Sequence, residues 1–407
     1  MPETLLIYAP VPLHRAPGGG LLLEDQACNG LRLWAENFDR LIALMPLDPG
    51  PAPPNWCPVA HVGAALDRIE IVPLPQAWRP DRFLRALPAA RKVIRAAIAR
   101  ADFLSFAIGG LFGDWGAVAC LEARRMGRSH AVWTDRVESE VTRRAARDAP
   151  HWRTRLRSRL YWRPMGWLER RLIARADLGL FHGRETFDHY APFARRAEMV
   201  HDIHLTRADH IAADDLRAKL AAAASGPLRI AYVGRADPMK GPDHWATVIE
   251  LLAAQGVDFT ATWLGEGSGW PALRDRLVPL GDRVQLPGFA ADRRTVLATL
   301  RAAHLLLFCH LTPESPRILI EALVSGTPLA GYDGAFARDL IAGHGGGVLV
   351  PLGDAAALAA EVAALATDRS RLARLITAAA RDGAPFEDEA VFRHRSELIR
   401  RHLPTGS

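Results

Sequence analysis

Residues 305–328 read LLLFCHLTPESPRILIEALVSGTP and describe a strand, a loop and a helix. The apolar run Leu305–Cys309 has the length of a strand that is buried on both faces. Ser315 suits a helix N-cap, Pro316 a first helical residue, and Gly326 the position just past the helix end. This order is typical of a doubly wound parallel sheet, in which the free N–H groups at the start of such a helix can bind phosphate.

The same alternation covers the rest of the 407 residues, a length that fits two domains of about 200 residues each. Strands are predicted at Thr4–Pro10, Arg40–Met45, Ile69–Leu74, Phe103–Ile108, His130–Thr134, Leu178–Phe181 and Ala197–His201, and again at Leu228–Val233, Thr260–Leu264, Val284–Leu286, Leu305–Cys309, Thr327–Gly331 and Gly347–Val350. The Pro- and Gly-rich residues 46–58 are expected to form a surface loop. The sequence therefore predicts an α/β protein with Rossmann-like domains at 1–205 and 228–385, joined by a linker at 206–227.

Composition indicates a soluble globular protein, with 49% hydrophobic and 24% charged residues. Cys28, Cys57, Cys120 and Cys309 contain no CxxC pair, which argues against a disulfide framework or a zinc knuckle and fits a reducing compartment. The N-terminus lacks the basic start of a signal peptide, and no apolar run reaches the roughly 20 residues of a membrane span. We therefore expect a cytoplasmic protein without a transmembrane segment.

Two groups of residues indicate an anion site. The segment YVGRADPMKG at 232–241 follows a strand and supplies Arg235, a bidentate donor, and Lys240, a point charge, as a diphosphate requires. A solvated basic turn is the alternative interpretation. Glu321 lies about two turns into the predicted helix, where its carboxylate could accept both hydroxyls of a ribose, although an exposed helix acid is the more usual role.

These two motifs, about 80 residues apart in the second of two α/β domains, resemble the donor-binding half of glycosyltransferase family 4, the group 1 glycosyltransferases. The resemblance implies the GT-B fold, with two Rossmann-like domains facing a cleft and a C-terminal helix, residues 386–407, that returns to the first domain. It further implies donor-binding roles for Arg235 and Lys240 on the diphosphate, for the amides of Arg317 and Ile318 on the phosphates, for Glu321 on the ribose, and for Phe289 on the base.

Three further assignments follow from the resemblance. The family pattern places its first glutamate at Pro313, whereas this chain has Glu314 at the next position. Either the loop shifts to bring Glu314 to the same place, which makes it the catalytic candidate near the transferred sugar, or that role is altered. Asp135 follows a strand at the place of an acceptor-site histidine in relatives, although an N-cap or a surface charge is the commoner role of such an acid. Gly19, in Gly18–Gly20, matches the glycine loop that approaches the donor, with a surface loop as the alternative.

Arginine is concentrated in one segment of the chain. Residues 143–175 contain eleven arginines and two acids, which gives +9, so the net charge of +6 leaves about −3 for the rest by subtraction. Four aromatic residues (Trp152, Tyr161, Trp162, Trp167) lie in the same segment. Arginine with interfacial aromatics is typical of a helix that lies on anionic lipid. We therefore predict membrane contact through Arg153, Arg155, Arg157, Arg159 and Trp162, with a solvated basic helix as the alternative.

The expected function is that of a hexosyltransferase-type glycosyltransferase at the inner face of the cell membrane. It would transfer a sugar from a nucleotide-diphosphate sugar to a hydroxyl of a glycan or lipid-linked acceptor, with retention as the resemblance implies. No metal, other cofactor or nucleic-acid partner is expected. Two alternatives remain open: a soluble GT-B enzyme that makes a small or storage glycoside, and a polyanion-binding or nucleic-acid-binding protein that uses residues 143–175.

Overall fold

A computed structural model describes residues 2–53, 56–148, 151–290, 292–312 and 314–404. The chain forms two compact units, one made of Met1–His204 with Asp388–Ser407 and the other of Leu205–Glu387. Each unit is built on its own parallel sheet, as the alternation of apolar runs and helical segments predicts.

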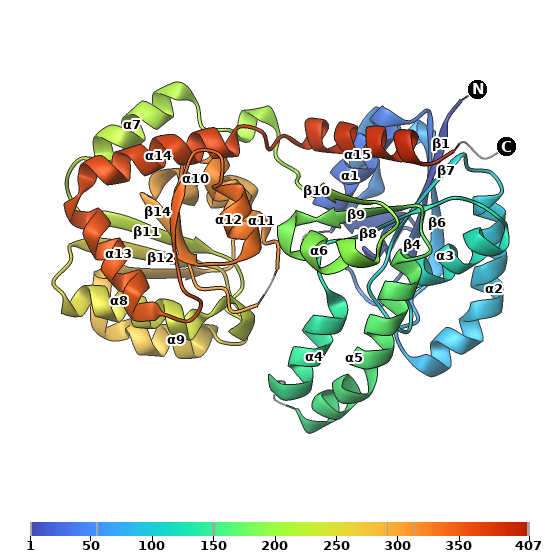
Figure 1. Ribbon diagram of the computed structural model, residues 1–407, viewed down its shortest axis with the longest axis horizontal. Coiled ribbons are helices and arrows are strands. Elements are labelled where there is room, and N and C mark those ends of the chain that lie inside the picture. Colours follow the sequence, from blue (N-terminus) through green and yellow to red (C-terminus); the bar gives the residue numbers. More distant parts are fainter. Residues whose placement is uncertain (1, 54–55, 149–150, 291, 313, 405–407) are drawn as a thin grey trace. The chain divides into compact units, whose positions relative to one another are not determined.

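The first unit contains a seven-stranded parallel sheet in the order β10-β9-β8-β7-β1-β4-β6 (Figure 1). Its strands are β1 (Thr4–Tyr8), β4 (Arg40–Leu47), β6 (Ile69–Pro75), β7 (Phe103–Ala107), β8 (Ala131–Thr134), β9 (Leu178–His182) and β10 (Ala197–Val200). All seven predicted strands are present, within a few residues at their ends. They could be recognised because every residue of β1, β7 and β9 is buried, as the helices on both faces require.

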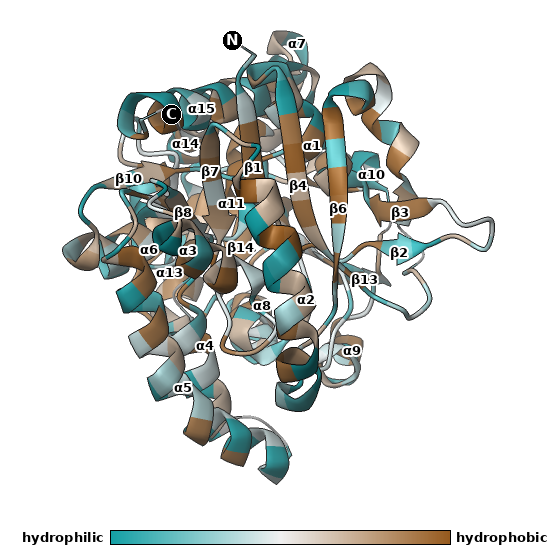
Figure 2. Ribbon diagram, turned by 90° about the vertical axis from the view of Figure 1, so that its right-hand side faces the viewer, coloured by the Kyte–Doolittle hydropathy of each residue, from teal (hydrophilic) through white to brown (hydrophobic). Residues whose placement is uncertain are grey.

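The helices of the first unit alternate with these strands along the chain. They are α1 (Asp25–Asn37), η1 (Val59–Arg68), α2 (Pro80–Ile98), α3 (Trp115–Arg125), α4 (Glu138–Asp148), α5 (Trp152–Ile173), α6 (Gly183–Tyr190), η2 (Ala191–Phe193) and α15 (Asp388–His402). The core between α2, α3 and the sheet contains Phe106, Trp115 and Ile94. Figure 2 shows the hydrophobic character of the strands that these helices cover.

A second, three-stranded antiparallel sheet belongs to the same unit. It consists of β2 (His14–Arg15), β3 (Leu21–Glu24) and β5 (Trp56–Pro58), in the order β2-β3-β5. The expected surface loop at 46–58 therefore ends in a strand, because Cys57 pairs with Leu23 and adds a short edge to the β2–β3 hairpin. This hairpin extends from the unit in Figure 2.

Helices α4 and α5 pack on each other and form a hairpin that extends from the first unit (Figure 1). A buried carboxylate fastens the base of this hairpin. Glu169 of α5 accepts hydrogen bonds from the amide and the hydroxyl of Ser139 in α4, at 3.0 and 2.6 Å, and from the hydroxyl of Tyr190 in α6, at 2.9 Å. Among the residues that the structure describes, no helix has both the length and the hydrophobicity needed to cross a bilayer.

The C-terminal helix α15 packs against α1 in the first unit. Its buried Arg395 lies over the rings of Trp34 and Trp133, with its guanidinium carbon 4.9 and 5.3 Å from the ring centroids. The same guanidinium pairs with Asp202 at 3.4 Å. A buried arginine is thereby neutralised and stacked, which explains how a largely polar helix is held on this unit.

The second unit contains a six-stranded parallel sheet in the order β13-β12-β11-β14-β15-β16. Its strands are β11 (Leu228–Val233), β12 (Phe259–Leu264), β13 (Val284–Gly288), β14 (Leu305–Phe308), β15 (Leu329–Tyr332) and β16 (Gly347–Val350), and its helices are η3 (Arg207–Asp209), α7 (Ala213–Ala223), η4 (Pro238–Lys240), α8 (Pro242–Ala254), α9 (Trp270–Leu277), η5 (Val278–Arg283), α10 (Arg293–Ala302), α11 (Arg317–Val324), α12 (Ala335–Leu340), α13 (Ala355–Thr367) and α14 (Arg369–Gly383).

Residues 206–227, interpreted from the sequence as a linker, lie within this second unit and carry η3 and α7. Helix α7 packs on α14. Its Lys219 is buried, and the Nζ atom donates to the carbonyl oxygens of Leu300 and Ser325 at 3.3 and 3.1 Å. These two hydrogen bonds attach the alanine-rich helix α7 to α10 and to the end of α11. They explain why this segment is ordered.

Candidate functional site

The loops that follow β11 and β12 approach each other closely because they contain glycine. A Cβ atom on Gly265 would lie 2.3 Å from the carbonyl oxygen of Gly234, and one on Gly267 would lie 2.8 Å from the backbone of Ala236. Gly265 also has a φ of 135°, which side chains rarely adopt. The Gly265-x-Gly267 pattern therefore packs backbone on backbone and holds the segment that carries Arg235 and Lys240.

Lys240 and Glu314 form the centre of the site. The Nζ atom of Lys240 lies 2.8 Å from Oε1 of Glu314, and both side chains are only 14% exposed. The neighbouring Gly241 has a φ of 64°, and a Cβ there would lie 2.2 Å from the carbonyl oxygen of Cys309. The loop after β11 is thus pressed against the loop after β14, which brings together two of the residues predicted from the sequence.

A buried histidine extends this pair into the core. The Tyr232 hydroxyl lies 2.8 Å from Nε2 of His310, whose Nδ1 lies 3.6 Å from Oε1 of Glu314. Burial raises the pKa of Tyr232 and, together with the charge of Lys240, lowers the pKa of His310. A protonated Tyr232 can donate to Nε2, which leaves Nδ1 to carry the proton that faces Glu314. His310 was not predicted from the sequence, although it lies directly after the strand Leu305–Cys309.

Helix α11 begins one residue later than predicted. Pro316, with φ −73° and ψ 122°, is the N-cap, and Arg317 is the first helical residue, so Ser315 does not cap this helix. The amides of Arg317 and Ile318 lie in the first turn, whose N–H groups have no partner within a helix. Gly326, with a φ of 62°, follows the helix end as predicted. The expected first glutamate position, Pro313, lies outside the described residues.

Glu321 is the fifth residue of α11, about one turn from its start rather than two. It is half-buried, and burial raises the pKa of its carboxyl group, while Arg293 and Arg317 act in the opposite direction. Among the described residues none donates a hydrogen bond to this carboxylate. A half-buried acceptor that lacks such a donor is suited to bind a ligand hydroxyl.

Arg235 and Phe289 are the exposed members of the predicted donor site. The Arg235 side chain is 73% exposed and pairs with Asp237 at 3.3 Å. Phe289 is 67% exposed, and its amide donates to Oε1 of Glu266 at 3.3 Å. Arg235 follows β11 and Phe289 follows β13, the two strands that flank β12. Both residues therefore lie at the same edge of the sheet as Lys240, which also follows β11. An exposed phenyl ring is available for stacking on a planar ligand.

Two predicted residues of the first unit are exposed. Gly19 lies in the turn between β2 and β3, where its φ is 86° and its amide donates to the Ala16 carbonyl. A Cβ at Gly19 would meet no atom within 4 Å. Gly18–Gly20 therefore form an exposed turn, and the approach of Gly19 to the donor stays a prediction. Asp135 is an exposed residue directly after β8, and its carbonyl oxygen lies 3.4 Å from the hydroxyl of Thr186.

A less exposed carboxylate, Glu138, lies three residues beyond Asp135 and was missed. Burial raises the pKa of Glu138, against the effect of its partner Arg136 at 2.6 Å. Its Cγ atom would lie 2.9 Å from a Cβ on Gly109, so the glycine lets this carboxylate approach the loop after β7. Asp114, whose pKa burial also raises, accepts from the amides of Gly109 and Gly110 in that loop. The pair Gly109-Gly110 after an apolar strand was the available sequence signal.

The arginine-rich segment forms α4 and α5, and the exposed apolar residues of α5 differ from those predicted. Trp152, Leu156, Leu160 and Trp167 are exposed. Trp162 is half-buried, and so is Arg155, whereas Arg153, Arg157 and Arg159 are exposed. At 3.6 residues per turn the four exposed apolar residues fall within an arc of about 80°, and Trp162 falls outside it. The predicted contact residue Trp162 therefore lies on a different side of α5 from this stripe.

Comparison with known proteins relates the second unit to a family. Residues 227–368 match the family described as "Glycosyl transferases group 1". The amylovoran biosynthesis glycosyltransferase AmsK of Erwinia amylovora is 29% identical over 192 residues, which are 45% of this chain and 47% of AmsK. The putative colanic acid biosynthesis glycosyltransferase WcaL of Salmonella typhimurium is 31% identical over 183 residues, which are 42% of this chain and 45% of WcaL. The chain thus spans about half the length of the curated relatives it matches.

The fold extends over both units. The crystal structure of HepE from Anabaena in complex with UDP has a TM-score of 0.67 to this structure and 18% sequence identity, and it covers 98% of this chain and 100% of HepE. At that identity the likeness establishes the fold. Residues 227–368 are therefore similar to the group 1 glycosyltransferases, and the two parallel sheets of the chain have the GT-B fold.

Proposed function

We propose that this chain is a glycosyltransferase that transfers a sugar from a nucleotide-diphosphate sugar to a hydroxyl of a glycan or lipid-linked acceptor, with retention. The match of residues 227–368 to this family and the names of the relatives support this reaction class. AmsK and WcaL are named for the biosynthesis of amylovoran and colanic acid, so we assign the acceptor to cell-surface polysaccharide or glycolipid synthesis.

The observation that carries the proposal is the 2.8 Å contact between Lys240 and Glu314 in the loop that leads into α11. It keeps a cation beside the start of a helix whose first N–H groups lack helical partners, and both favour an anionic group. In the reaction the anomeric carbon loses its bond to the diphosphate oxygen and gains one to the acceptor oxygen. Lys240, Arg235 and the α11 amides would stabilise the charge that develops on the departing diphosphate.

The same site suggests roles for the neighbouring groups. Glu321 would accept the ribose hydroxyls, and Phe289 would contact the base. Glu314, held by Lys240, would place its carboxylate near the sugar as positive charge develops there. In the first unit, Glu138 is a better candidate than the exposed Asp135 for an acceptor hydroxyl, because its pKa is raised and it lies against Gly109.

The donor assignment is tested by calorimetric titration with UDP, GDP, ADP and dTDP. UDP is the first choice because HepE was crystallised with UDP. We expect selective binding of one nucleotide, lost by more than tenfold in Lys240→Ala and in Glu321→Ala. Arg217→Ala, which removes an exposed cation of α7 in the same unit, is the matched control and should bind normally. Absence of nucleotide binding in the wild type would contradict the proposal.

We further propose that α5 places the enzyme on an anionic membrane surface, at the inner face of the cell membrane. The exposed stripe of two tryptophans and two leucines supplies the apolar contact, and the exposed arginines around it supply the charge. Each basic residue near such a surface contributes about 1 kcal/mol at moderate salt. An apolar stripe beside arginines favours binding to lipid, because a lipid surface contacts both. A nucleic acid would contact the charges and leave the apolar stripe in water.

Sedimentation with vesicles that contain anionic lipid tests this surface. The triple change Arg153→Gln, Arg159→Gln and Arg163→Gln should release the protein from the vesicles. Neutralising the exposed Arg82, Arg85 and Lys92 of α2 removes the same charge elsewhere and should release it less. Equal loss in both variants, or binding to RNA as tight as to vesicles, would instead support the polyanion-binding alternative.

A further inference from the structure

Two cysteines that are far apart in the sequence face each other in the first unit. The Sγ atoms of Cys28 and Cys57 lie 3.8 Å apart, although 29 residues separate them in the chain. The sequence contains no CxxC pair, so nothing in it indicated this contact. Cys28 is buried in the first turn of α1, and Cys57 is partly exposed in β5.

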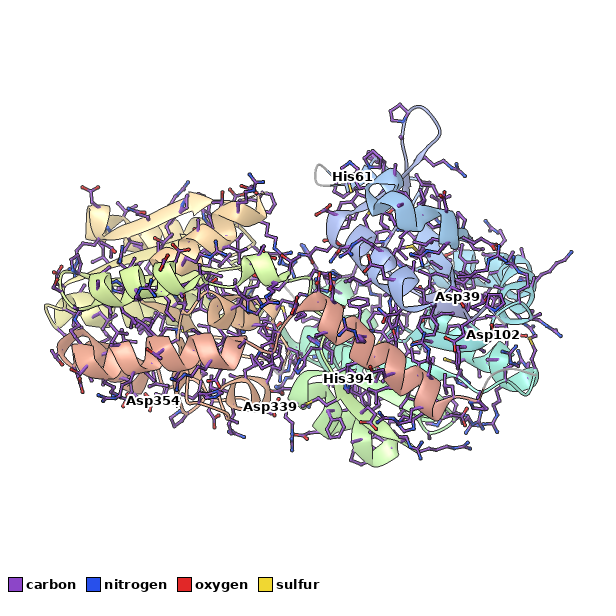
Figure 3. The ribbon with its side chains drawn as sticks, turned by 90° about the horizontal axis from the view of Figure 1, so that it is seen from above. Asp39, His61, Asp102, Asp339, Asp354 and His394 are labelled. Atoms are coloured by element: carbon purple, nitrogen blue, oxygen red, sulfur yellow. The ribbon has the colours of Figure 1, made fainter. Side chains whose placement is uncertain are left out.

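Two more side chains that can bind a metal ion lie near the Sγ atom of Cys57. One atom each of Asp25, Cys57 and His61 lies within 4.8 Å of the other two, and Oδ1 of Asp25 lies 4.0 Å from Sγ of Cys57. Asp25 opens α1, one turn before Cys28, and His61 lies in η1, which packs on α1. His61 is labelled in Figure 3. Asp25, Cys57 and His61 thus form one cluster of potential ligands from α1, β5 and η1, and Cys28 adds a second sulfur through its contact with Cys57.

We propose that Asp25, Cys28, Cys57 and His61 bind one Zn²⁺ ion in a four-coordinate structural site. Two thiolates, one imidazole and one carboxylate form a set that suits this ion. The spacing Cys57-x₃-His61 is of the local kind that zinc sites use, and Asp25-x₂-Cys28 is close to it.

The separation of the two sulfurs fits a shared metal. Two sulfurs bound to one tetrahedral zinc, each about 2.3 Å from it, lie about 3.8 Å apart. The observed separation is 3.8 Å, whereas a disulfide requires about 2.05 Å. Asp25 and His61 are both exposed, so rotation of their side chains can bring the oxygen and nitrogen to the shorter metal distances.

The location of the site indicates what the metal would do. Cys57 pairs with Leu23 and so belongs to the small β2-β3-β5 sheet, whereas Cys28 lies on α1, which packs against η1 and α15. A zinc ion would therefore tie the edge of that small sheet to the helices beside it. Four protein ligands leave no open position, which is typical of structural rather than catalytic zinc.

Metal binding by the full chain tests the proposal. The reduced protein, freed of metal with a chelator, is titrated with Co²⁺ and then with Zn²⁺. We expect one equivalent of Co²⁺ to give the thiolate charge-transfer and visible bands of a tetrahedral site, and Zn²⁺ to displace it. Zinc should also raise the melting temperature of the first unit.

Variants identify the ligands independently of activity. Cys57→Ser should abolish the charge-transfer band, and His61→Ala should weaken Co²⁺ binding at least tenfold. Cys120→Ala and His394→Ala, which change a cysteine of α3 and an exposed histidine of α15, are the matched controls. Circular dichroism verifies that each variant is folded.

Two outcomes would overturn the proposal. One is that the reduced protein binds no Co²⁺ while Cys28 and Cys57 close to a disulfide on oxidation, which would make them a redox pair. The other is that Cys57→Ser or His61→Ala binds metal as tightly as the wild type.

Discussion

Lys240 and Glu314, 74 residues apart in the chain, form an ion pair of 2.8 Å that links the loops after two adjacent strands, β11 and β14. Both side chains are mostly removed from water, so each charge depends on the other for stabilisation. Strand adjacency places the pair at the edge of the sheet where α/β proteins bind their ligands.

Removing Lys240 alone should destabilise the protein more than removing both charges. Lys240→Met leaves Glu314 largely buried without its partner and should cost about 2–4 kcal/mol of unfolding free energy. In Lys240→Met/Glu314→Gln much of that loss should be recovered, since no unpaired charge remains. Urea denaturation of the wild type, Lys240→Met, Glu314→Gln and the double variant measures this coupling.

Nucleotide binding should depend on the charge of Lys240 rather than on the stability of the protein. The double variant is expected to be stable yet to bind the nucleotide at least tenfold more weakly than the wild type. If it binds as tightly as the wild type, Lys240 acts only in the fold.

Gly241 should tolerate no side chain. Its φ is 64°, and a Cβ would lie 2.2 Å from the carbonyl oxygen of Cys309, which is backbone and cannot rotate away. Gly256, at the end of α8, has a φ of 70° but open space around a Cβ. We expect Gly256→Ala to cost about 1 kcal/mol from the left-handed backbone alone, and Gly241→Ala to cost clearly more. Equal losses in thermal or urea unfolding would mean that the loop can move away from Cys309.

The sequence predicted the two sheets because their strands are short apolar runs, and such runs do not depend on remote contacts. The donor motifs were predicted for a similar reason, since Lys240 and Glu321 lie in continuous segments next to strands. Glu138 could not be chosen over Asp135, because its burial depends on the approach of Gly109 from another strand end. The Cys28–Cys57 contact was equally hidden, because it depends on the pairing of β5 with β3.

The exposed side of α5 is a further feature that the sequence could not predict. Arginine recurs along the whole helix, so composition indicates an unusual surface but not which side is free. Ser158 and Glu169 are buried against the rest of the unit, and that packing decides which residues remain exposed. Trp162 was therefore chosen where Trp152 and Trp167 are the exposed tryptophans.

Glu169 should make stability depend on pH. Burial raises the pKa of its carboxyl group from the ordinary value of 4.5 to about 7, despite hydrogen bonds from Ser139 and Tyr190 that lower it. The folded state therefore holds this proton more tightly than the unfolded state. The resulting stabilisation is complete below pH 4.5 and is lost as the pH rises towards 7.

Comparison with Glu169→Gln isolates this contribution. The stability of the wild type minus that of the variant should fall by about 3 kcal/mol from pH 4.5 to 7.5, at 1.36 kcal/mol per pKa unit. Tyr190→Phe removes one hydrogen bond to the carboxylate and should move the fall to higher pH. A difference between wild type and Glu169→Gln that does not change with pH would show that folding does not raise the pKa of this carboxyl group.

Membrane binding should depend on which tryptophan of α5 is removed. Trp152 and Trp167 are 62% and 61% exposed and share the apolar stripe with Leu156 and Leu160, whereas Trp162 is half-buried. Each exposed tryptophan can enter the lipid interface without leaving the core of the unit, because its ring lies at the surface under the neighbouring Arg153 or Arg171. Trp152→Ser/Trp167→Ser should therefore reduce binding to anionic vesicles at least tenfold and leave the melting temperature nearly unchanged. Trp162→Ser should instead lower the melting temperature and leave vesicle binding nearly unchanged, because it removes a packed ring.

Loss of vesicle binding in Trp162→Ser, with the double variant still bound, would place the lipid contact on the side predicted from the sequence. Tryptophan fluorescence adds a second readout, since a blue shift on vesicle addition should disappear in the double variant alone.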